Sequence, residues 1–111
     1  GLDLKQLRSI VEMFREGLLA GKGPRHKCFM VCLALSSYLR LQGITNSLTE
    51  GKVKKRHCHY WITLPSGEIV DPTASQFKAP GGEPMPAVYI GAKPLWYEAK
   101  PGQIRLRWGP T

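Results

Sequence analysis

A cysteine in this sequence is placed where a nucleophile would be activated. Cys28 follows a Gly-Pro break and begins the most apolar segment of the chain, so we expect it in the first turn of a buried helix. The N–H groups and the positive dipole end at that point favour a thiolate. The same N–H groups could hold the oxyanion that forms when a thiolate attacks a carbonyl group. A small, inert core residue is the alternative role for Cys28.

A histidine and an aspartate lie on either side of a predicted hairpin. Residues 57–73 read HCHYWITLPSGEIVDPT, with a tight turn at 65–67. The returning strand brings Asp71 back towards the level of His59. A carboxylate there could accept a hydrogen bond from the imidazole, fix its tautomer and stabilise its charged form. Taken singly, His59 also fits a strand edge and Asp71 a turn before proline.

Two helices should support the cysteine. Apolar residues at three- and four-residue steps predict a helix over 3–20, with Asp3 as its N-cap and Gly21 as its stop. A second helix is expected over 28–42, ended by Gly43. It is apolar nearly all round, which is typical of a central buried helix.

Strands should follow the helices. The best is 58–64. With the extended residue before it included, His57, His59 and Trp61 share one face, so His57 competes with His59 as a base. The opposite face is apolar and is expected to be core, which would bury Cys58, and Cys32 is also expected to be core. Further strands are predicted at 44–53, 69–70, 86–90 and 103–108, with a Pro- and Gly-rich loop at 78–86.

This order of elements predicts an α+β fold. The 111 residues are expected to form one domain, 1–111. No apolar run approaches the length of a membrane span, and no signal segment is visible. The sequence does not begin with Met, which favours an excised domain. Three cysteines, an odd number, predict a free thiol and a reducing environment.

The chain is basic, with a net charge of +8 and a pI of about 9.7. This balance favours acidic partners. A binding module for nucleic acid or protein, without catalysis, is therefore an alternative function. No aromatic residues are interleaved with the basic ones as in nucleic-acid recognition motifs, so nucleic acid is the less favoured partner. The densest cluster of positive charge contains Lys52, Lys54, Lys55 and Arg56.

The order of these motifs resembles the transglutaminase-like branch of the papain-like thiol enzymes. A cysteine heads a buried helix that closes with LRLQGI, a strand then begins His-x-Trp, and the hairpin ends Asp-Pro-Thr. The resemblance covers residues 23–77. It implies a papain-like fold in which Cys28 is the nucleophile, His59 the base and Asp71 the orienting acid. It requires no metal or other cofactor.

The chain also departs from that family. No glutamine or tryptophan lies shortly before Cys28, so the second oxyanion donor is unassigned. Residues 78–111 have no counterpart. The resemblance gives Trp61 and Thr73 structural positions. The candidates for substrate or oxyanion contacts are His26, Trp61 and Gln76.

The resemblance implies chemistry at a carboxamide or peptide carbonyl. A thioacyl-enzyme would be released by water, as in a cysteine protease or a protein glutamine deamidase, or by an amine, as in a cross-linking transglutaminase. A small domain with a Pro- and Gly-rich loop gives no sign of a tunnel that keeps water out, which favours hydrolysis. Size and charge suggest a toxin or effector domain that acts on protein or peptide and is held by an acidic inhibitor or immunity protein.

A metal site is the remaining alternative. Two cysteines one helical turn apart and two histidines on one strand face could supply four tetrahedral zinc ligands. This interpretation leaves Asp71 without a role, and we rank it below the triad. The four ligands would be Cys28, Cys32, His57 and His59.

Overall fold

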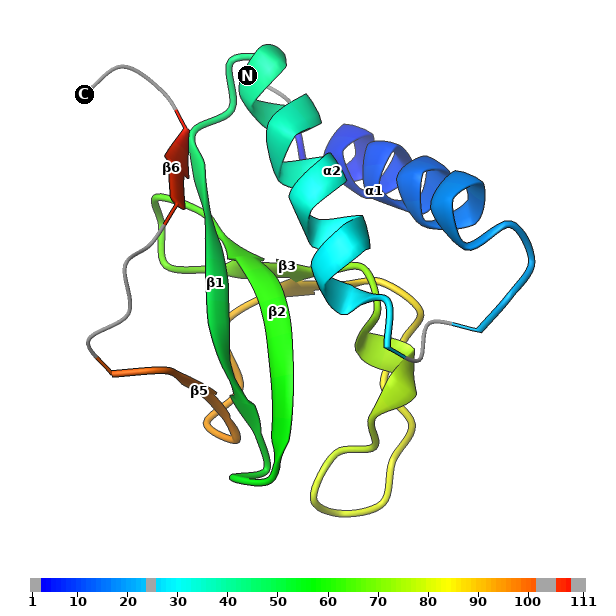
Figure 1. The fold of residues 1–111 in the computed structure, drawn as a ribbon, viewed down its shortest axis with the longest axis vertical. Coiled ribbons are helices and arrows are strands. Elements are labelled where there is room, and N and C mark those ends of the chain that lie inside the picture. Colours follow the sequence, from blue (N-terminus) through cyan, green and yellow to red (C-terminus); the bar gives the residue numbers. More distant parts are fainter. Residues whose placement is uncertain (1–2, 24–25, 102–105, 109–111) are drawn as a thin grey trace.

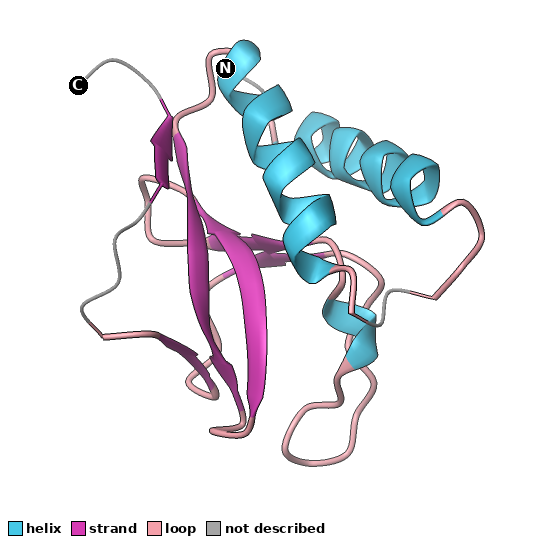
Figure 2. Ribbon diagram, viewed as in Figure 1, coloured by secondary structure: helices cyan, strands magenta, loops and turns pink. Residues whose placement is uncertain are grey.

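Two helices lie against one face of a curled antiparallel sheet (Figures 1 and 2). The computed structural model describes residues 3–23, 26–101 and 106–108. The predicted α+β class is confirmed. Within the described residues, no helix has the length and apolar character needed to cross a membrane.

The first helix, α1, spans Leu4–Leu19 and begins as predicted at Asp3. The Asp3 carboxylate accepts from the Gln6 N–H at 2.8 Å, and the Gln6 side chain accepts from the Asp3 N–H at 3.0 Å. This reciprocal pair satisfies two N–H groups that the helix leaves free. The helix ends at Ala20, whose φ of 48° is left-handed.

The second helix, α2, spans Cys28–Leu41 and is followed by Gly43 with φ 81°. The predicted stop is therefore confirmed, because glycine adopts this conformation without steric cost. At the other end, Lys27 occupies the N-cap position and makes no side-chain capping bond. The first N–H groups of α2 consequently have no side-chain acceptor at the cap.

The sheet is built around a long hairpin. Strand β1 spans Asn46–Val53 and pairs along its whole length with β2, His57–Thr63. Strand β3, Ile69–Asp71, pairs with β2 only at Ile62 and Thr63. The first half of β2 therefore has no strand neighbour on that side within the described residues.

Three short strands complete the sheet, whose path runs β4-β3-β2-β1-β5, with β6 also on β1. The predicted strand at 86–90 forms three residues later than expected, and β5 was not predicted because three residues give too little alternation to detect. Residues 103–105 of the last predicted strand lie outside the described residues. The three strands are β4 (Tyr89–Gly91), β5 (Tyr97–Ala99) and β6 (Leu106–Trp108).

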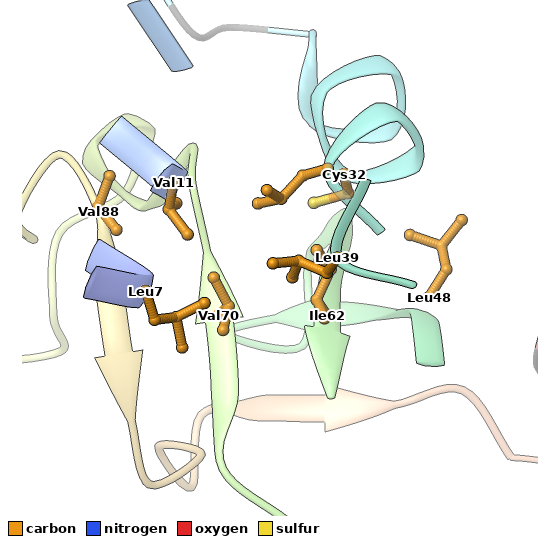
Figure 3. Packing of buried hydrophobic residues seen from close by; sticks show 9 residues of the cluster. Leu7, Val11, Cys32, Leu39, Leu48, Ile62, Val70 and Val88 are labelled. Atoms are coloured by element: carbon orange, nitrogen blue, oxygen red, sulfur yellow. The ribbon is translucent and has the colours of Figure 1, made fainter. Parts of the chain in front are cut away.

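The sheet has a core on each face. Figure 3 shows the one beneath the helices, in which Val11 of α1 and Leu39 of α2 pack with Ile62 and Val70. On the opposite face, Trp61 packs with Val53, Ile69 and Tyr97, and all four are fully buried. The curl of the sheet lets short strands from later in the chain cover this second face.

The curl corrects two expectations about β2. Only the face opposite to His59 and Trp61 was expected to be core, but these two residues are fully buried as well. Cys58 was expected to be core and is exposed. It pairs with Lys52 next to the turn of the hairpin, before the point at which α2 covers the sheet.

A glycine in β1 makes the second core possible. Gly51 pairs with His59 on one side and with Ala99 on the other. A Cβ at this position would lie 2.3 Å from the end of the Trp61 ring and 2.2 Å from the Glu98 carbonyl oxygen. The indole therefore packs directly on bare backbone, which only glycine provides.

Gly51→Ala should consequently destabilise the protein. We expect a loss of about 2 kcal/mol in the free energy of unfolding, because the indole and β5 must move away from the new methyl group. Urea or thermal unfolding measures it. Gly17→Ala is the matched control: it lies in α1 with nothing within 4 Å of the added Cβ, and it should stabilise by about 0.5–1 kcal/mol. An unchanged free energy of unfolding in Gly51→Ala would contradict this packing.

Candidate active site

His59 and Asp71 form a buried pair. Continuing the β2–β3 register from Ile62 and Val70 places Asp71 on the face of the sheet that carries His59. His59 Nε2 and Asp71 Oδ2 are 2.7 Å apart, and both residues are fully buried. The predicted hydrogen bond between the two side chains is confirmed.

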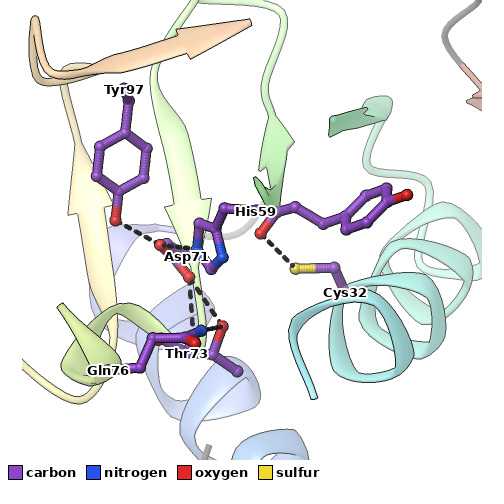
Figure 4. A network of polar contacts seen from close by, with 7 residues as sticks. Cys32, His59, Asp71, Thr73, Gln76 and Tyr97 are labelled. Atoms are coloured by element: carbon purple, nitrogen blue, oxygen red, sulfur yellow. Dashed lines mark hydrogen bonds and ion pairs between the residues drawn. The ribbon is translucent and has the colours of Figure 1, made fainter. Parts of the chain in front are cut away.

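The Asp71 carboxylate is held by further donors, shown in Figure 4. Tyr97 of β5 donates its hydroxyl to Oδ2 at 2.5 Å. The Thr73 N–H donates to Oδ1 at 3.0 Å, and the Thr73 hydroxyl lies at 3.4 Å from the same atom. Both oxygens are thus engaged, which fixes the orientation of the carboxylate and offsets the cost of burying it.

Cys28 lies where the start of α2 contacts the part of β2 with which β3 does not pair. The residue is half-buried and opens the helix. Its sulfur interacts with the His59 ring and with the backbone N–H groups of Tyr60 and Phe29. One turn further, the Cys32 thiol donates to the Tyr60 carbonyl at 3.5 Å. Two cysteines on consecutive turns therefore contact the two backbone groups of one strand residue.

These contacts change the acidity of the Cys28 thiol. Burial acts to raise the pKa of Cys28 and is the largest single influence. The His59 ring and the N–H groups of Tyr60 and Phe29 act in the opposite direction and together outweigh it, so the pKa is lowered. A thiol that is more acidic despite its burial is a prepared nucleophile.

The imidazole responds in the complementary way. Burial acts to lower the pKa of His59, but the hydrogen bond that the ring donates to Asp71, then the interactions with Cys28, raise the pKa to about 9. At neutral pH the ring is therefore protonated on both nitrogens and positively charged. The charged ring and the Cys28 thiolate stabilise each other.

The two ring nitrogens of His59 have different roles. Nε2 faces Asp71, whereas Nδ1 is buried and has no hydrogen-bond partner among the described residues. The contact between Cys28 and the ring is therefore looser than a full hydrogen bond. A proton on Nδ1 is free of competing acceptors and available to a group that approaches the sulfur.

Cys32 has the structural role that was expected. It is fully buried, and burial, followed by the charges of Asp71 and Cys28, raises the pKa of its thiol well above the usual value. It stays protonated and holds α2 against β2 through Tyr60. Cys28 and Cys32 thus differ in acidity because only Cys28 contacts the imidazole and free N–H groups.

The other predicted site residues differ in their burial and contacts. Trp61 is fully buried with its ring 6.1 Å from that of His59, so it supports the ring from within the core and does not reach the surface. Gln76 donates to the carbonyl and hydroxyl of Thr73, both at 3.2 Å. His26 is exposed and has a left-handed φ of 63°.

His57 does not share the triad geometry. Its side chain is exposed, and within the described part of the chain no carboxylate pairs with it. Its ring lies 5.8 Å from that of Phe77. His59 is therefore the histidine that is placed to act on Cys28.

The zinc alternative is wrong. Among the residues that the structure describes, no group of three or more His, Cys, Asp or Glu side chains is placed to hold a metal ion. The physical reason is the register of β2, which turns His59 inwards to Asp71 and leaves His57 exposed. The four ligands in question were Cys28, Cys32, His57 and His59.

Two further residues shape the site. Tyr97 donates its hydroxyl to Asp71. The ring of Phe77 meets the His59 ring edge-on at 4.7 Å. Nothing local marks either role. Tyr97 reaches Asp71 through the pairing of β5 with β1, which is a long-range contact.

Comparison with known proteins supplies no relative: no family model, curated protein or solved structure matches the chain. The assignment of a function therefore depends on the geometry and acidity of the site.

Asp71→Asn tests the origin of the raised His59 pKa. Removing the negative charge while keeping the shape should lower the pKa of the ring from about 9 by roughly one unit or more, because burial then acts with less opposition. An NMR titration of the ring measures this shift. Glu68→Gln removes an equal charge from an exposed turn and should leave the titration unchanged. An unchanged pKa in Asp71→Asn would show that the carboxylate does not control the ring.

Proposed function

We propose that this chain is a thiol-dependent acyl-transfer enzyme that hydrolyses a carboxamide or peptide bond. Cys28 is the nucleophile, His59 the acid and base, and Asp71 the orienting group. A papain-like fold belongs to the same proposal. It is supported by a cysteine-headed helix that packs on an antiparallel sheet carrying the histidine and the aspartate.

The observation that carries the proposal is the paired shift in acidity. The pKa of the Cys28 thiol is lowered although burial alone would raise it, and the pKa of its partner His59 is raised to about 9. A purely structural cysteine gains nothing from such an arrangement, as the raised pKa of Cys32 in the same helix illustrates.

The reaction begins with attack of the Cys28 thiolate on the carbonyl carbon, which forms a carbon–sulfur bond. In this proposal the first N–H groups of α2, which have no side-chain cap from Lys27, hold the oxyanion. His59 gives its proton to the leaving amine as the carbon–nitrogen bond breaks. Water then attacks the thioester, His59 takes up its proton, and the acid leaves as the thiolate is restored.

Water is the acceptor that we propose, and the half-buried position of Cys28 supports this choice because the residue is partly open to solvent. Peptide cleavage and deamidation of a glutamine side chain follow the same steps and differ in the leaving group, an amine or ammonia. Cross-linking by an amine acceptor would need a site from which water is kept out. A binding module without catalysis is supported by the basic composition alone, and we place it second.

Incubation with glutamine-containing peptides tests the proposal. Mass spectrometry distinguishes cleavage, exchange of a side-chain amide for an acid, and incorporation of an added amine. We expect one of the two hydrolytic products with the wild type and a loss of about a thousandfold or more in Cys28→Ser, because the nucleophile is removed. Circular dichroism checks that the variant is folded. Turnover that survives in Cys28→Ser would contradict the proposal.

The pH dependence of turnover should reflect the two shifted groups. Activity needs Cys28 as thiolate and His59 as imidazolium. The rate should therefore rise at a pH below the ordinary thiol pKa, since that pKa is lowered, and fall as pH passes about 9, where His59 loses its proton. Initial rates across pH 5 to about 10.5 show both limbs. A rate that falls already near pH 6.5, as for an ordinary histidine, would contradict the raised pKa.

A further inference from the structure

A cavity of about 660 Å³ opens beside the triad. It lies between three segments: the turn before α2, the start of β2, and the short 3-10 helix η1 (Ala74–Gln76) with the residue that follows it. The side chains that matter for its chemistry are those of His26, Arg56, His57, Gln76 and Phe77.

One wall of this cavity contacts a catalytic residue, and a second is linked to one through Thr73. Phe77 meets the His59 ring edge-on at 4.7 Å. Gln76 donates to the hydroxyl oxygen of Thr73, and that hydroxyl lies 3.4 Å from the Asp71 carboxylate. The third wall, at His26, is two residues before Cys28 in the chain. An occupant of the cavity would therefore lie against the Phe77 ring that contacts the imidazole, and near the start of α2.

The lining of the cavity is selective for negative charge. Among the described residues, its lining contains the guanidinium of Arg56, two imidazoles, an amide, the Ser75 hydroxyl and the exposed Cys58 thiol, but no carboxylate. Arg56 is exposed at its rim and has no ion-pair partner among the described residues. Two other cavities of the molecule also contain lysines, but both include the Glu98 carboxylate, which would repel a carboxylate of the substrate.

We propose that this cavity binds a carboxylate side chain of the substrate, so that the enzyme acts on amides flanked by an acidic residue. The proposal rests on the proposed function. Arg56 supplies the charged, forked donor that carboxylates prefer, and the histidines and Gln76 supply further polar contacts. The Phe77 ring forms an apolar wall beside them, which strengthens such a pair by keeping water away.

Two alkylating probes that differ only in charge test this inference. The α-amides of N-iodoacetyl-glutamate and N-iodoacetyl-glutamine differ only in the charge of the side chain, and both can alkylate Cys28: the thiolate forms a carbon–sulfur bond and iodide leaves. We expect the glutamate probe to label Cys28 about tenfold faster at low salt, which corresponds to one charge-assisted hydrogen bond. Mass spectrometry of the peptide that contains Cys28 gives both rates.

Two variants test whether the cavity causes the difference between the two labelling rates. Arg56→Gln should reduce the ratio of the two rates to near one. Lys55→Gln removes the same charge one residue away, at a position that lines the other two cavities, and should keep most of the ratio. A ratio near one in the wild type, or an equal loss in both variants, would overturn the inference.

The same data separate this inference from the proposed function. Slow labelling of Cys28 at neutral pH by the neutral probe would count against an activated thiol. The ratio of the two labelling rates of Cys28 tests the subsite independently, because the reactivity of the thiol itself cancels in that ratio. A reactive Cys28 with no charge preference would thus overturn only the subsite.

Discussion

Asp71 is fully buried, and a buried carboxylate is costly unless hydrogen bonds occupy its oxygens. Its partners come from different parts of the chain: His59 from β2, Tyr97 from β5, and Thr73 two residues further along. The curl of the sheet and the attachment of β5 to β1 are what bring these partners together. Gly51 serves the same arrangement, because its lack of a side chain lets the Trp61 ring and β5 close over the second core.

The position of the nucleophile depends on an incomplete strand pairing. Because β3 pairs with β2 only at Ile62 and Thr63, the edge of β2 at Tyr60 is left for α2. Cys32 fixes the helix there through the Tyr60 carbonyl, and Cys28 then interacts with the Tyr60 N–H and with the His59 ring. The structural Cys32 and the reactive Cys28 are thus one helical turn apart, and the pKa of the first is raised whereas that of the second is lowered.

Local signals in the sequence were sufficient for much of this arrangement. The capping pattern at Asp3, the glycine after α2, and the hairpin that returns Asp71 to His59 depend on residues close together in the chain, and all were predicted. Tyr97 and the exposure of Cys58 were not, because they depend on how the sheet curls and on how far α2 extends over it. The cavity at Arg56 joins three distant segments and likewise leaves no local pattern. The papain-like fold stays a prediction.

The central claim is that Cys28 is activated by His59, and the rate of iodoacetamide labelling of each cysteine against pH tests it most directly. Cys32 and Cys58 serve as internal controls, one fully buried and one exposed. In the wild type we predict that Cys28 reacts fastest, with a midpoint below the ordinary thiol pKa, and that His59→Ala raises this midpoint and slows the reaction at neutral pH. Labelling of Cys28 that is as slow as that of Cys32, or that does not change in His59→Ala, would contradict the account.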